Sequence, residues 1–162
     1  MHTTELAHLH RCVELATEAV EAGDEPFGSL LVAQDGTVLA EDRNRVAGTG
    51  DPIRHPELAL ARWAATHLPP SARAAATVYT SGEHCPMCAA AHGWAGLGRI
   101  VYGHSSAQLA GWLAEWGAPA APVRPLPVQD VVPGVVVAGP APELTEQLRE
   151  LHRRSRATSS GI

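Results

Sequence analysis

The sequence predicts an α/β protein, a three-layer α/β/α sandwich built on a mixed five-stranded sheet. Short apolar runs with strand propensity alternate with longer segments of helical periodicity. An Asp-Gly pair separates the first two apolar runs, which predicts an antiparallel hairpin. Helices between the later strands predict a largely parallel remainder, because parallel neighbours need a crossover connection. The 162 residues are enough to enclose one hydrophobic core.

In the first half of the chain, periodicity and helix-breaking residues set the expected boundaries. Apolar residues recur at intervals of three and four in the first helix, and Pro69 and Pro70 end the second. The expected elements are a helix at 4–22, strands at 28–33 and 38–40, a polar loop at 42–54 and a helix at 56–67.

In the second half, Ser105 or Ser106 is expected to cap a helix, and five prolines between 119 and 133 predict no regular structure there. Whether residues 117–133 form a lid, a partner contact or a plain connector stays open. The expected elements are strands at 77–80, 99–102 and 135–137 and helices at 86–94, 105–116 and 142–154. We expect a single domain over residues 1–155 and a disordered tail over 156–162.

Composition excludes several classes of function. The chain has 12 arginines and no lysine, which removes P-loop nucleotide hydrolysis and lysine imine chemistry. The net charge of -5 disfavours binding along a nucleic-acid backbone. No apolar run approaches the roughly 20 residues of a membrane-spanning helix, and the acidic N-terminus lacks the features of a secretory signal. Three cysteines cannot form a disulfide framework, so we expect a cytoplasmic location.

Two short motifs together predict a metal centre. His55-Pro-Glu57 and Cys85-Pro-Met-Cys88 each lie where a helix is expected to begin, with a proline at the first helical position. Cysteines three apart on one helical turn point the same way, and the helix N-terminus favours their thiolate forms. The His-x-Glu pattern is common by chance, whereas the paired-cysteine spacing is typical of zinc sites.

Two thiolates and one imidazole suit a tetrahedral zinc ion and leave one position for water, as in catalytic sites. Glu57 would lie beside the metal without binding it and could shuttle protons. Two alternatives remain at this point: a fourth side chain closes a structural site, or the cysteines bind nothing. The candidates for a fourth ligand are Cys12, His84, His92 and His104; Cys12 is otherwise expected to be a small buried hydrophobe.

These motifs resemble the zinc-dependent cytidine deaminase superfamily, whose signature is His-x-Glu followed by Pro-Cys-x-x-Cys. The resemblance extends over residues 26 to about 103. It implies one zinc ion per subunit held by His55, Cys85 and Cys88, with Glu57 as the proton shuttle. The chain departs from the usual pattern at Pro56, where the family has a small residue, and at His84, where it has a proline.

With a helix expected at 105–116, between the fourth and fifth strands, the chain resembles the branch of the superfamily that contains guanine deaminases and tRNA adenosine deaminases. There the resemblance implies base contacts for Asn44, Phe27 and Trp94. Asn44 could instead be only a turn residue, and Phe27 and Trp94 only core. His84 is expected either to be solvated or hydrogen-bonded, or to modify substrate preference beside the metal.

The expected activity is zinc-dependent hydrolytic deamination of a free nucleobase, guanine or a related triazine or modified base. Alternatives are adenosine deamination in tRNA, a cytosine-type reaction, or an inactive zinc-stabilised binding domain. The C-terminal arginines alternate with glutamates, which disfavours nucleic acid as a partner. No tyrosine follows Tyr102, although similar guanine deaminases commonly close the pocket with one. A homodimer is implied, and Trp112, Leu113 and Trp116 could help to bury its interface. Trp63, Trp112 and Trp116 are each expected in the core or at an interface.

Overall fold

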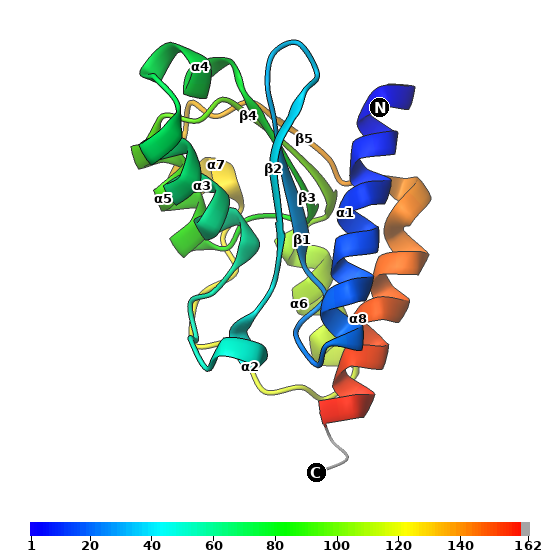
Figure 1. Ribbon diagram of the computed structural model, residues 1–162. Coiled ribbons are helices and arrows are strands. Elements are labelled where there is room, and N and C mark those ends of the chain that lie inside the picture. The colour runs from blue at the N-terminus through cyan, green and yellow to red at the C-terminus, as the bar shows by residue number, and fades with distance from the viewer. Residues whose placement is uncertain (160–162) are drawn as a thin grey trace.

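The computed structural model describes residues 1–159 and confirms the predicted α/β architecture. One mixed sheet has the strand order β2-β1-β3-β4-β5 and carries helices on both faces (Figure 1). The strands are β1 (Gly28–Val32), β2 (Val38–Arg43), β3 (Thr77–Gly82), β4 (Arg99–His104) and β5 (Val137–Ala138). The helices are α1 (Thr3–Glu21), α2 (Val46–Thr49), α3 (Pro56–His67), α4 (Pro70–Ala75), α5 (Pro86–Ala95), α6 (Ser106–Glu115), α7 (Val128–Val131), the 3-10 turn η1 (Pro142–Leu144) and α8 (Thr145–Ser159).

The pairing of the strands follows the predicted mixture. β1 is antiparallel to both β2 and β3, whereas β3 with β4 and β4 with β5 are parallel. Helix α6 lies in the crossover between β4 and β5, as a parallel connection requires. Its N-cap is Ser105, whose side chain accepts from the Gln108 N–H in a capping box.

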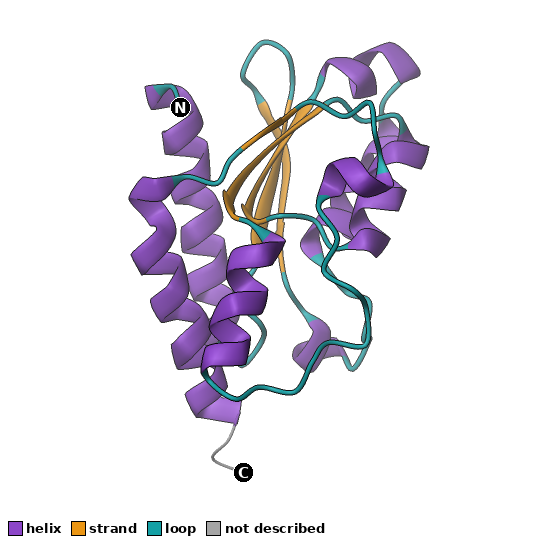
Figure 2. Cartoon of the chain, turned by 180° about the vertical axis from the view of Figure 1, so that it is seen from behind, coloured by secondary structure: helices purple, strands orange, loops and turns teal. Residues whose placement is uncertain are grey.

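The two helical layers have different members. Helices α1 and α8 cover one face of the sheet and α3 and α5 the other (Figure 1), and the view from behind shows α6 beside α1 and α8 (Figure 2). Because successive side chains of a strand face opposite ways, Leu30 packs toward α1 and Leu31 toward α3. By the same alternation Ser29, and Thr80 two residues after Val78, face α3.

The structure differs from the predicted elements in five segments. The loop expected at 42–54 and the irregular segment at 119–133 each contain one helical turn, α2 and α7. Pro69 and Pro70 end α3 but also begin α4, since proline suits the first helical position. β5 is only two residues long, and the terminal helix starts as η1.

Helix α8 continues to Ser159, so residues 156–159 are helical and do not form the disordered tail that was expected from residue 156. Arginine and alanine at 156–157 are good helix formers and allow this continuation. Residues 160–162 lie outside the described part of the chain. No helix within residues 1–159 is long and apolar enough to cross a membrane.

Candidate active site

Three predicted metal ligands converge where α3 and α5 begin. His55 is the N-cap of α3 and Cys85 the N-cap of α5, with proline following each. The Sγ atoms of Cys85 and Cys88 are each 3.6 Å from His55 Nδ1. All three candidate ligand atoms lie within 4.8 Å of one another. The side-by-side packing of two helix N-termini therefore brings the two sequence motifs, 30 residues apart, to one point.

The geometry of this group fits a zinc ion. Zinc bonds of about 2.3 Å to sulfur and about 2.1 Å to nitrogen, arranged tetrahedrally, place S and N ligands roughly 3.6 Å apart. The two observed S–N distances have this value. Within residues 1–159, no other His, Cys, Asp or Glu joins the group. The four-ligand alternative with Cys12, His84, His92 or His104 thus gains no support, and three protein ligands would leave one position on a zinc ion for water.

Electrostatics within the group favour binding of a cation. The thiol of Cys88 and the imidazole of His55 hydrogen-bond to Cys85 and lower the pKa of Cys85 to about 4. The same Cys85 sulfur raises the pKa of Cys88 and that of His55. One thiolate is therefore present at neutral pH, and a bound divalent cation would displace the remaining proton.

Glu57 occupies the second position of α3 and is only 5% exposed. The Thr80 hydroxyl donates to Glu57 Oε1 at 2.8 Å, and the Ser29 hydroxyl donates to Thr80 Oγ1 at 2.9 Å. Burial raises the pKa of Glu57, which suits a group that must hold and release a proton near neutral pH. Ser29 and Thr80 were not among the predicted site residues; the signal available in the sequence was a polar residue within each of two buried strands.

Asn44 and Phe27 lie together at the end of the β1–β2 pair. The Asn44 N–H donates to the Phe27 carbonyl at 2.9 Å, and Asn44 is 1% exposed. Its Oδ1 accepts from the Val46 N–H, while its Nδ2 has no hydrogen-bond partner among the described residues. Phe27 is half-buried. Asn44 therefore keeps an unused N–H donor, as a substrate contact would require.

His84 differs from its expected solvated or hydrogen-bonded state. It is 1% exposed, and neither ring nitrogen has a partner in the described part of the chain. Its ring meets the His92 ring edge-on at 5.3 Å, and burial lowers the pKa of His84 well below its usual value.

Of two tryptophans singled out in the sequence, one differs from its predicted place and one agrees with it. Trp94 is 92% exposed near the end of α5, so within one chain it does not wall a pocket. Trp94 follows Cys88 by six residues and therefore lies more than one helical turn beyond the metal ligands. Trp112, expected in the core or at an interface, is 9% exposed and packs in the core against the His104 and His152 rings. Cys12 is fully buried, as predicted.

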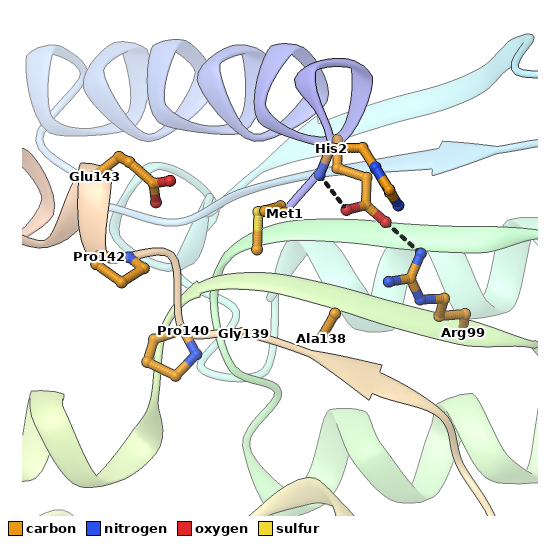
Figure 3. Close-up of a pocket in the computed structure, with 9 residues that line it drawn as sticks. Met1, His2, Arg99, Ala138, Gly139, Pro140, Pro142 and Glu143 are labelled. Atoms are coloured by element: carbon orange, nitrogen blue, oxygen red, sulfur yellow. Dashed lines mark hydrogen bonds and ion pairs between the residues drawn. The ribbon is translucent and has the colours of Figure 1, made fainter.

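A cleft of about 330 Å³ opens at the opposite end of the sheet, near the start of β4 (Figure 3). The Arg99 guanidinium forms an ion pair with Glu5 inside it. Its lining residues are Met1, His2, Glu5, Arg99, Ala138, Gly139, Pro140, Pro142 and Glu143. None of the predicted site residues lines this cleft.

The chain is similar to a known protein family and to several known proteins. Residues 2–104 match the family described as the cytidine and deoxycytidylate deaminase zinc-binding region. The chain is 39% identical over 107 residues to a guanine deaminase of Bacillus subtilis, which covers 64% of this chain and 68% of that protein. It is 38% identical over 88 residues to a tRNA-specific adenosine deaminase of Agrobacterium fabrum, covering 54% and 57% of the two chains.

Among solved structures, the chain resembles the guanine deaminase from Nitrosomonas europaea with a TM-score of 0.68. That match covers 93% of this chain and 84% of the other at 22% identity, and it concerns the fold alone. The matched segments span about two thirds or less of the length of the two curated relatives.

Proposed function

Because the chain belongs to the cytidine and deoxycytidylate deaminase zinc-binding family, we propose that it hydrolytically deaminates a free nucleobase, guanine or a related triazine or modified base. The observation that carries the proposal is Glu57, a buried carboxyl group held by hydroxyls beside a three-ligand metal group. The 39% identity to a guanine deaminase supports the choice of base.

In the proposed reaction, zinc held by His55, Cys85 and Cys88 would supply a water activated for attack on the ring carbon bearing the amino group. Glu57 would take one proton from this water and give it to a ring nitrogen as the new C–O bond forms. It would then take the proton of the resulting hydroxyl group and give it to the amino group, which leaves as ammonia while the carbon becomes a carbonyl. The Thr80 hydroxyl fixes the carboxyl group for both transfers.

Two further residues would bind the base. The Asn44 Nδ2 donor is free to bind an acceptor on the ring, since its Oδ1 is already used by Val46. The Phe27 ring offers an apolar wall to a planar substrate. His84 is buried next to His92 and would act only on the shape of the site.

Charge pairing on α8 supports a small substrate over RNA. Arg149 donates to Glu115 at 2.7 Å, and Arg153 binds Glu150 through two bonds of 2.7 Å. These pairs reduce the positive charge that phosphate binding needs. Adenosine deamination in tRNA is the second candidate, favoured by the 38% identity to a tRNA-specific adenosine deaminase.

Ammonia release over a panel of guanine, cytosine, a triazine, adenosine and an anticodon stem-loop tests the proposal. We expect release from guanine or a triazine, insensitive to salt, and none from the Glu57→Gln variant. Release only from the stem-loop, falling steeply with salt, would move the chain to the tRNA enzymes. Cytosine as the only substrate would indicate the cytosine-type reaction, and a zinc-loaded protein inert toward the whole panel would be a binding domain.

A homodimer and a cytoplasmic location are also proposed. Trp94 is a large apolar side chain exposed on α5, and Ile53 is 51% exposed before α3. Burial of such side chains would favour association of two copies. The three cysteines are free, as a reducing compartment requires. Sedimentation velocity that shows only monomer at micromolar concentration would reject the dimer.

A further inference from the structure

A buried pair of histidines joins the C-terminal helix to the end of β4. His104 is the last residue of β4 and His152 lies in α8, and their Nε2 atoms are 3.1 Å apart. The two residues are 1% and 5% exposed. Burial lowers the pKa of His104 to about 4 and lowers that of His152 well below its usual value. Both rings are therefore neutral at pH 7, and one must donate to the other.

The contacts of His104 decide which ring donates. Its Nδ1 lies 3.2 Å from the Ser105 carbonyl oxygen, which can only accept, so the Nδ1 carries the proton. In a neutral imidazole the Nε2 is then an acceptor. It follows that His152 donates from its Nε2, which fixes the tautomer and the orientation of the His152 ring.

Phe27 packs against this pair. Its ring meets the His152 ring edge-on with centroids 5.2 Å apart and lies 6.1 Å from the His104 ring. The rings also approach β3 closely at Gly82. A Cβ atom there would lie 2.6 Å from His104 Nε2 and 2.9 Å from Phe27 Cε1. Glycine at this position therefore lets the three rings meet over the strand.

The backbone around Phe27 is tied to the candidate active site. The Phe27 carbonyl accepts from the Asn44 N–H, and the Gly28 N–H donates to Ser81 Oγ at 3.1 Å. The neighbouring Thr80 holds Glu57. The backbone at Phe27 is thus fixed from β2 and β3, whereas contacts with the histidine pair restrain its ring.

We infer that His152 is a positioning residue of the base pocket: its imidazole, oriented by His104, fixes the Phe27 ring against which the base packs. This inference rests on the proposed function. It gives α8 a part in substrate binding through Phe27, although His152 itself is buried. Loss of the imidazole should leave the zinc ligands and Glu57 in place and should weaken only the binding of the base.

Two substitutions separate hydrogen bonding from packing. His152→Met keeps an apolar side chain of similar length but removes the donor, whereas His152→Gln keeps an N–H donor at similar reach. We expect His152→Met to raise KM for the base about tenfold, the effect of one lost hydrogen bond, with kcat and zinc content nearly unchanged. His152→Gln should return KM to within about threefold of the wild type.

A second readout does not depend on activity. Phe27 is the only phenylalanine in the chain, so fluorophenylalanine labelling gives a single ¹⁹F resonance from its ring. His152→Met should shift or broaden this resonance and His152→Gln should restore it. The control is Leu148→Val, a fully buried position on the same helix, which should lower the melting temperature and leave both KM and the resonance unchanged.

An unchanged resonance in His152→Met would overturn the inference, and so would an equal shift in Leu148→Val. A shifted resonance with unchanged KM would also overturn it, because Phe27 would then not wall the pocket. If the wild type releases no ammonia from any free base, the proposed function is wrong. The part of the inference that concerns binding of the base is then wrong as well. The ¹⁹F result would then still decide whether His152 holds Phe27.

Discussion

Acidification should destabilise this protein through the His104–His152 pair. The pKa of histidine in an unfolded chain is about 6.5, whereas burial lowers the pKa of folded His104 to about 4. A histidine whose pKa is lowered by folding contributes its full stability above pH 6.5. The contribution is lost as the pH falls from about 6.5 toward 4, because the unfolded chain binds a proton that the folded chain excludes.

The size of the effect follows from the shift. At pH 4.5 the difference between pKa values of about 6.5 and about 4 lowers the free energy of unfolding by about 2.5 kcal/mol for His104 alone. His152 is shifted in the same direction and adds to the loss. Because whole domains are stable by only about 5–15 kcal/mol, the effect is large enough to measure.

The assay is urea unfolding followed by tryptophan fluorescence between pH 7.5 and 4.5. The comparison variant is His104→Leu/His152→Leu, in which both members of the pair become apolar and neither leaves an unpaired partner. We expect its stability to match the wild type at pH 7.5 within about 1 kcal/mol and to exceed it by about 2.5 kcal/mol or more at pH 4.5. Protonation of the zinc ligands affects both proteins alike. Parallel loss of stability in the two proteins would refute the reasoning.

Three further substitutions test the candidate active site. Glu57→Gln should abolish ammonia release while zinc content by atomic absorption stays at the wild-type level; measurable turnover would remove Glu57 from its role. Thr80→Val should lower kcat about tenfold or more, because a hydrogen bond to a charged group contributes about 1.5–3 kcal/mol; unchanged kcat would show that the hydroxyl does not matter. Cys85→Ser should lose zinc, whereas Cys12→Ala, at a buried cysteine outside the site, should keep it; equal zinc content in both would contradict the ligand assignment.

Local signals in the sequence determined much of the fold and the metal ligands. Pro56 at the first position of α3 and Ser105 at the cap of α6 act on their own helical turns, so both helix starts were predictable. The spacing of Cys85 and Cys88 likewise places two sulfurs on one turn whatever the rest of the chain does. For this reason the zinc group could be predicted from the sequence as a hypothesis, and its geometry fits.

Tertiary packing decided what the remaining polar and aromatic side chains do. Nothing near Trp94 in the sequence indicates that it is exposed, and nothing near His84 that it is buried without a partner. The bond between His104 and His152 joins residues 48 apart. The hydroxyl of Thr80 reaches Glu57 only because β3 pairs with β1, a strand that packs against α3. Such contacts depend on how the sheet and helices stack, which no short stretch of sequence specifies, whereas caps and ligand spacings are settled within a single turn.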